Sequence, residues 1–211
     1  MQPWIVEYGT LWILETDNGL PPICPARVEV KFEEVSVAGI DDLAGAMGLS
    51  DPEPIRQRLQ SGRRCFILRA EDQIVTYGWV TQGVEYVGEL DRQFNFHNDE
   101  AYIWDCGTVP AWRGQRCYSA LLSQMIYRLH DEKISHIWIG ASRLNQPSIR
   151  GFANAGFKPV VDCTYRRFFR LTLMWFHQAL SIRQPLVSAA CRILLNDHER
   201  RFGRLAIGFK R

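Results

Sequence analysis

The sequence predicts a mixed α/β (α+β) fold in which a central mixed β-sheet is flanked by helices. Segments of strand length recur along the chain, and helical stretches lie between several of them. The second half runs strand, helix, strand, helix, strand, which requires parallel pairing in at least part of the sheet. The 211 residues are enough for one domain with a full hydrophobic core.

The first half is predicted to consist mostly of strands. Residues 4–15 are β-rich, and a breaker cluster at residues 18–25 is expected to isolate this strand or hairpin from the main domain. Residues 27–37 alternate apolar and charged side chains as a half-buried strand does. Helices are then expected over 39–47 and 51–60, strands over 64–70 and 73–82, and an irregular polar segment over 83–100.

The second half contains the strongest helix pattern of the chain. An apolar stripe recurs at helical spacing through Tyr118, Leu121, Leu122, Met125, Ile126 and Leu129. We expect strands over 101–108, 134–141 and 159–169 and a short helix over 147–155, then a last strand over 171–176 and a helix over 186–195. The organisation predicted is an N-terminal extension (1–25), a main domain (26–176) and a C-terminal extension (177–211).

Composition and charge exclude several classes of protein. Hydrophobic residues make up 46%, which argues against disorder and against a membrane span. The net charge of +2 provides no overall field for nucleic acid, so no nucleic-acid partner is expected and any anion site must be local. Basic and apolar residues interleave in the tail. This pattern leaves open a membrane-surface or dimer-forming segment, although a helix packed on the domain's own surface is favoured.

The cysteines and the N-terminal sequence predict a reducing, cytoplasmic location. Six cysteines are scattered without a CxxC pair, and no His stands at metal-ligand spacing, so we expect reduced thiols and no metal site. The first residues lack a basic region, and acidic residues interrupt their apolar run, which is unlike a signal peptide.

Two motifs point to chemistry. In TVPAWRGQRCYS, a proline ends a strand, and Arg113, Gly114, Gln115 and Arg116 form the loop that opens the long helix. Helix N-termini leave N–H groups unpaired and carry partial positive charge, so the loop suits a phosphate or pyrophosphate. The second motif is NQPSI, in which Asn145 is a plausible N-cap, followed by Gly156-Phe157 at the end of a short helix.

Together these motifs resemble the Gcn5-related N-acetyltransferase family, which shows V-x-P-x-x-[QR]-x-x-G-x-[GA] after a strand and later N-x-x-S/A-I before a helix that ends in G-F. The resemblance covers roughly residues 27–169. It implies a central, partly splayed sheet, with coenzyme A in the splay between the strands at 101–108 and 134–141. It also implies transfer of an acetyl group from acetyl-CoA to an amine in a ternary complex, with no metal. The positions implied to bind the acyl donor are Cys106, Gly107, Thr108, Arg113, Gly114, Gln115, Arg116, Cys117, Tyr118, Asn145, Ser148 and Phe152.

The chain departs from the family pattern at positions that bear on its chemistry. Arg116 and Tyr118 occupy the glycine-type positions of the loop; we interpret Arg116 as a phosphate partner and Tyr118 as a packing residue. Many members carry a proton-donating Tyr where this chain has Phe152, and Phe cannot donate a proton. The alternative to an enzyme is therefore a non-catalytic acyl-CoA-binding sensor or scaffold of the same fold.

Asp105 is the candidate on the acceptor side. The resemblance to polyamine-acetylating members places it in the cleft, whereas the alternative is an ion pair with an Arg elsewhere in the fold. Alternation does not settle which face it occupies, because a bulge at Gly107 would change the register. The acceptor is expected to be a small-molecule or peptide amine, and a homodimer remains open.

Overall fold

The structure, a computed structural model, describes residues 4–90, 92–169, 171–179, 182–196 and 199–209. These residues form the strands β1 (Trp4–Glu15), β2 (Lys31–Glu34), β3 (Arg64–Ala70), β4 (Gln73–Thr81), β5 (Val84–Val87), β6 (Arg92–Asn95), β7 (Glu100–Thr108), β8 (His136–Ser142), β9 (Lys158–Phe168), β10 (Leu171–Gln178), β11 (Glu199–Phe202) and β12 (Leu205–Phe209). The α-helices are α1 (Ile40–Met47), α2 (Glu53–Gln60), α3 (Cys117–Asp131), α4 (Gln146–Asn154) and α5 (Gln184–Leu194), and short 3-10 helices cover Val37–Gly39, Gly88–Leu90 and Pro110–Trp112.

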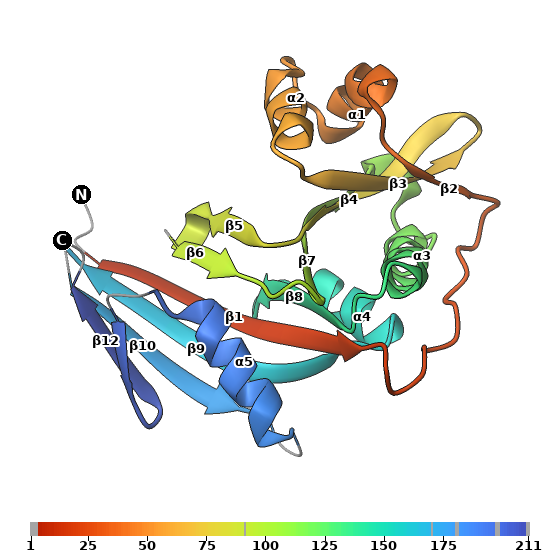
Figure 1. Cartoon of the computed structure of the whole chain (residues 1–211). Coiled ribbons are helices and arrows are strands. Elements are labelled where there is room, and N and C mark those ends of the chain that lie inside the picture. Colours follow the sequence, from red (N-terminus) through yellow and green to blue (C-terminus); the bar gives the residue numbers. More distant parts are fainter. Residues whose placement is uncertain (1–3, 91, 170, 180–181, 197–198, 210–211) are drawn as a thin grey trace.

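One large mixed sheet organises the molecule (Figure 1). Its strand order is β11-β12-β10-β9-β1-β8-β7-β4-β3-β2, and β5 and β6 form a separate two-stranded hairpin. The predicted parallel pairing is confirmed between β7 and β8. Their paired residues end at Ile103 and Ile139, although both strands continue, so the sheet parts beyond these residues.

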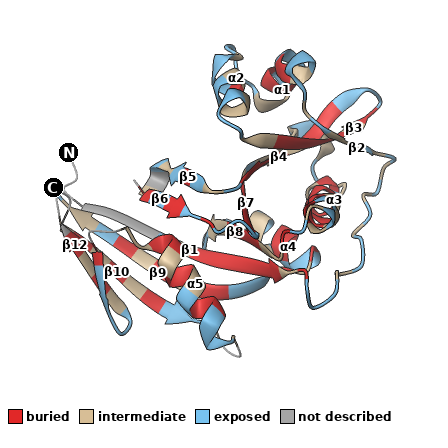
Figure 2. Cartoon of the chain, in the orientation of Figure 1, coloured by how far each residue is buried: buried red, intermediate tan, exposed pale blue. Residues whose placement is uncertain are grey.

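Helices cover both faces of the sheet. Phe66 and Leu68 of β3 belong to the core that α3 and α4 complete, whereas Cys65 and Ile67 face the core beneath α1 and α2. Because side chains alternate along a strand, these helix pairs lie on opposite faces of this part of the sheet. The second large core lies beneath α5, and Figure 2 shows buried residues on the sheet-facing sides of the helices.

The N-terminal strand is not the separate extension that the breaker cluster predicted. It lies in the middle of the sheet, antiparallel to β8 on one side and to β9 on the other. Leu11 and Ile13 enter the core beneath α5, whereas Trp12 and Leu14 enter the core beneath α3 and α4. A strand buried on both faces has a continuous apolar run, and LWIL is such a run.

The remaining expectations were mostly confirmed at the level of element type. The strand expected over 27–37 is shorter, at Lys31–Glu34, and the segment 83–100, expected to be irregular, contains the β5–β6 hairpin. In the C-terminal region, β10 and α5 are confirmed, and β11 and β12 extend the sheet. Residues 180–181, 197–198 and 210–211 of the expected tail lie outside the described residues. In the described part of the chain, no helix is long and apolar enough to cross a membrane.

Candidate functional site

A bulge in β7 shapes the site. Trp104 pairs with Trp79 and Gly107 pairs with Tyr77, so two β7 residues, Asp105 and Cys106, stand opposite Gly78 alone. Asp105 has a φ of 40°, a backbone conformation that Asp adopts more readily than most residues. The extra residue re-aims the end of β7 where the strand separates from β8. The bulge considered at Gly107 therefore lies just before it, at Asp105 and Cys106.

Two glycines make room for this bulge. A Cβ at Gly78 would lie 2.9 Å from Cys106 Sγ, and one at Gly107 would clash with Tyr77 Oη. A larger residue at either position would displace the bulge or the Tyr77 ring. These glycines therefore provide close approach rather than flexibility.

Asp105 is both a cavity residue and an ion-pair partner of an arginine, the two roles that the sequence left as alternatives. Its Oδ2 accepts a hydrogen bond of 2.5 Å from Arg58 Nη1, and its carboxylate lines a cavity. The guanidinium carbon of Arg58 stands 5.0 Å from the ring centre of Trp79 and 4.8 Å from that of Trp104, which fixes the arginine beside the carboxylate. Among the described residues, none donates a hydrogen bond to Asp105 Oδ1, which leaves this oxygen available to a ligand.

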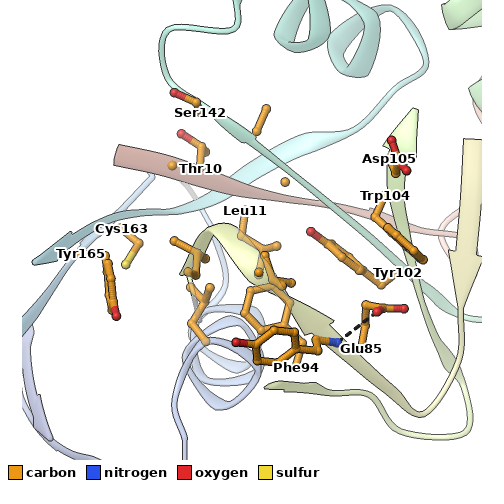
Figure 3. Close-up of a pocket in the computed structure, with 18 of the residues that line it drawn as sticks. Thr10, Leu11, Glu85, Phe94, Tyr102, Trp104, Asp105, Ser142, Cys163 and Tyr165 are labelled. Atoms are coloured by element: carbon orange, nitrogen blue, oxygen red, sulfur yellow. Dashed lines mark hydrogen bonds between the residues drawn. The ribbon is translucent and has the colours of Figure 1, made fainter. Parts of the chain in front are cut away.

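The cavity has a volume of about 820 Å³ and is surrounded by strands from both halves of the sheet (Figure 3). Its lining comprises Tyr8, Gly9, Thr10 and Leu11 of β1, Arg58 of α2, Glu85, Tyr86, Val87, Gly88, Leu90 and Phe94 of the β5–β6 hairpin, Tyr102, Trp104 and Asp105 of β7, Gly140, Ala141 and Ser142 of β8, Cys163 and Tyr165 of β9, and Leu194 of α5. Of the described residues that line it, none comes from α3 or α4. The cavity therefore lies on the α5 side of the parted strands.

The loop before α3 lies on the other side of the parted strands, and several of its backbone N–H groups have no acceptor among the described residues. Gly114 has a φ of 82°, and a Cβ there would meet no atom within 4 Å. Arg116 caps the helix in the left-handed conformation. Within the described chain, no acceptor is found for the N–H groups of Gly114, Gln115, Arg116 or Tyr118. Unpaired N–H groups, two arginines and a helix N-terminus together suit an anion.

The loop is held in place by the segment that precedes β2. Arg27 donates from its backbone N–H to the carbonyl oxygen of Gln115 at 2.9 Å and from its side chain to that of Gly114 at 3.3 Å. Arg113 donates weakly to the carbonyl oxygen of Thr108, at 3.4 Å. These bonds from Arg27 occupy carbonyl oxygens of the loop, so its N–H groups remain available to a ligand.

The second motif lies beside this loop. Asn145 caps α4 by accepting a hydrogen bond of 3.2 Å from the Ser148 N–H. The Tyr118 ring packs so closely on α4 that a Cβ at Gly151 would lie 2.5 Å from it, and it also contacts Phe152. Phe152 is only 1% exposed and packs among aromatic rings, so it serves the core where the resemblance implied an acyl-donor contact.

Two titratable groups near the bulge are held protonated. Burial raises the pKa of the Cys106 thiol to about 12, and the Asp105 carboxylate acts in the same direction. Burial and the neighbouring Cys106 raise the pKa of Tyr118 well above its usual value, and a hydrogen bond with Ser148 opposes them. Cys106 is therefore a neutral thiol rather than a nucleophile. In the described residues, no group of three His, Cys, Asp or Glu side chains could hold a metal ion.

The structure brings the sequence-predicted residues together in two groups on either side of the bulge. Arg113 to Tyr118, Asn145 and Ser148 lie on the α3–α4 side, whereas Asp105 lies in the cavity. The prediction missed the β1 contribution, Tyr8 to Leu11. The apolar run in β1 was the available signal, because an extension has no need to bury both of its faces.

The sheet thus parts between a helix N-terminus with open N–H groups on one side and a ligand-sized cavity on the other. The model of the acetyltransferase (GNAT) family matches residues 40–157, more than half of the chain. The chain therefore belongs to the GNAT acetyltransferase family. No curated protein gives a significant match to its sequence.

Solved structures share the fold at low sequence identity. A GNAT-family acetyltransferase from Colwellia psychrerythraea is 9% identical with a TM-score of 0.55, over 77% of this chain and 56% of that one. A putative GNAT-family acetyltransferase from Novosphingobium aromaticivorans is 12% identical with a TM-score of 0.54, over 83% and 66%. A protein of unknown function from Staphylococcus epidermidis is 11% identical with a TM-score of 0.52, over 77% and 61%. This chain thus spans less than two thirds of each of these proteins.

Proposed function

We propose that this chain is an N-acetyltransferase that moves an acetyl group from acetyl-CoA to an amine by direct attack in a ternary complex. The observation that carries the proposal is the parting of β7 and β8 between an open anion loop and a cavity that contains a carboxylate. Two substrates bound from opposite sides would meet there. The family assignment supports acetyl-CoA as one of them.

Each group of residues then has a separate task. The N–H groups of Gly114 to Tyr118, with Arg113 and Arg116, hold the pyrophosphate of the acyl donor, and the backbone of Cys106 to Thr108 holds its pantetheine arm. Asp105 binds the acceptor amine and takes a proton from it directly or through water. The amine nitrogen bonds to the thioester carbon, the carbon–sulfur bond breaks, and the thiolate leaves and is protonated.

We propose Tyr118 as the source of that last proton. Phe152 cannot supply it, and the Tyr118 hydroxyl lies within hydrogen-bonding reach of Cys106 and Ser148, at the bulge. Because its pKa is raised, this phenol remains protonated at neutral pH. The buried Phe152 is also the observation that favours the second candidate function, a non-catalytic acyl-CoA-binding sensor or scaffold. Release of coenzyme A thiol with an amine panel would distinguish the enzyme from the sensor.

Gly114→Glu is expected to weaken acetyl-CoA binding by more than tenfold, or over about 1.4 kcal/mol, in calorimetric titration. The new carboxylate would stand where the loop offers its N–H groups to the pyrophosphate. Gly114→Gln is the matched control, because it places an uncharged side chain of similar size on the same left-handed backbone. Equal affinity of the Glu variant and the wild type, with the fold retained, would remove the loop from the proposed site.

Tyr118→Phe is expected to lower kcat by about tenfold, because the ring still packs on Gly151 while the proton donor is lost. The raised pKa fixes the sign of the pH dependence. The donor is active below its pKa, so its deprotonation should cause no loss of activity between about pH 7 and 9. Tyr127→Phe is the control, because that hydroxyl donates to the Pro21 carbonyl oxygen instead. An unchanged kcat in Tyr118→Phe would assign the proton to solvent.

A further inference from the structure

From the cavity lining we infer that the acceptor is a monoamine with an aromatic or similarly planar apolar body, and not a polyamine. This inference rests on the proposed function for the reaction and adds the chemical class of the acceptor. Three observations lead to it: aromatic rings surround the cavity, one of its two carboxylates already has all its hydrogen-bond donors, and an arginine lies beside each carboxylate.

Aromatic rings line the cavity from its interior to its rim (Figure 3). Phe94, Tyr102 and Tyr165 are buried, and the Phe94 and Tyr102 rings meet edge to face with centres 5.6 Å apart. Tyr8 and Tyr86 line the same cavity but are 44% and 57% exposed. Rings from β1, β6, β7, β9 and the hairpin strand β5 thus converge on one space large enough for a small ligand.

Glu85 is a carboxylate of the cavity that is already fully used. Its Oε2 accepts from Arg63 Nε at 2.8 Å and from Thr81 Oγ1 at 2.5 Å, and its Oε1 accepts from Arg63 Nη2 and from the Tyr86 N–H, both at 3.0 Å. Thr81 in turn accepts from Trp104 Nε1. Each carboxylate oxygen thus has two donors, so Glu85 holds the hairpin to β4 and has little capacity left for an ammonium group.

Asp105 offers one oxygen to one amine. Its Oδ2 is taken by Arg58, whereas Oδ1 has no donor among the described residues. A second ammonium group near it would meet the guanidinium of Arg58, which Trp79 and Trp104 hold in place. Like charges at close range in a partly buried site repel strongly. The cavity therefore accommodates a single positive charge, joined to a body that packs against rings.

The test compares amines of similar basicity as acceptors for the full chain with saturating acetyl-CoA. We expect kcat/KM for 2-phenylethylamine to exceed that for n-hexylamine by about tenfold and that for spermidine by about a hundredfold. Binding of 2-phenylethylamine is also titrated by calorimetry in the presence of coenzyme A, which measures recognition independently of turnover.

Tyr8→Ala and Tyr86→Ala test whether the amine binds in this cavity. Both rings are exposed, so their loss should leave the fold intact. Each is expected to raise the KM for 2-phenylethylamine by about tenfold and to change that for n-hexylamine much less. Phe169→Ala and Phe202→Ala are the matched controls: both rings are exposed, and neither residue lines the cavity. They should leave both amines unaffected.

Failure of this inference and failure of the proposed function give different results. Acetylation with spermidine preferred, or with no preference among the amines, would overturn the acceptor class and leave the transferase in place. Binding of 2-phenylethylamine without turnover, weakened by Tyr86→Ala, would support the acceptor site and refute the transferase. If the aromatic amine is neither bound nor acetylated, the inference is overturned outright.

Discussion

Replacement of Arg92 by Met is expected to lower the free energy of unfolding by about 3–5 kcal/mol, measured by urea denaturation. Arg92 and Glu199 form an ion pair in which both side chains are only 1% exposed. Arg92 Nη1 donates to Glu199 Oε2 at 2.6 Å and to the Leu194 carbonyl oxygen at 2.7 Å, and Nη2 donates to Glu199 Oε1. Without the guanidinium, a carboxylate would be buried with no compensating charge.

The location of this pair connects stability with the candidate site. Arg92 opens β6, part of the hairpin that forms one wall of the cavity, whereas Glu199 belongs to β11 at the sheet edge. The Arg92 guanidinium carbon also stands 4.9 Å from the ring centre of Tyr165, another cavity residue. We therefore expect Arg92→Met to lower affinity for the acceptor as well, and affinity for acetyl-CoA much less.

Two comparisons isolate the buried charge. The double replacement Arg92→Met with Glu199→Leu removes both charges, so it should recover most of the lost stability. Arg183→Met is the matched surface control, because Arg183 pairs with Glu15 while remaining 64% exposed, and it should cost less than about 1 kcal/mol. If the single and double replacements at Arg92 proved equally destabilising, loss of packing rather than an unpaired charge would be the cause.

Asp105→Asn is expected to lower kcat/KM for the acceptor by about a hundredfold while acetyl-CoA affinity stays unchanged. Asn matches Asp in shape and also tolerates a positive φ, so the bulge should persist. The replacement removes the carboxylate that is proposed to bind the amine and to accept its proton. Steady-state kinetics with varied acceptor, together with calorimetric titration of acetyl-CoA, separates the two substrates.

Asp99→Asn is the control for this change, because Asp99 is an exposed carboxylate that hydrogen-bonds Ser135 before the start of β8, outside the cavity lining. It should leave the kinetics unchanged. Full activity of Asp105→Asn would show that the pair with Arg58 is structural only. Unfolding of Asp105→Asn at the assay temperature, measured by circular dichroism, would attribute its lost activity to the pair with Arg58 instead.

Local signals in the sequence were enough to predict much of the scaffold and the loop on one side of the candidate site. The apolar stripe from Tyr118 to Leu129 predicted α3, and Asn145 predicted the start of α4. The loop from Arg113 to Arg116 was recognisable because it combines a strand-ending proline, a glycine and a helix N-terminus within a few residues. Each of these features depends on residues that are neighbours along the chain, so the pattern and spacing of residue types are sufficient to predict it.

The cavity side of the candidate site was decided only by the tertiary structure. Whether Asp105 faces a cleft depended on a bulge opposite Gly78, and its partner Arg58 lies 47 residues away in sequence. β1 was predicted as a strand, but its place between β8 and β9 arises from pairing across most of the chain length. Such pairings depend on which buried faces fit together, and no short window of sequence contains that information. The sequence thus determined most of the elements and the loop from Arg113 to Arg116, whereas the cavity exists only because distant strands converge around it.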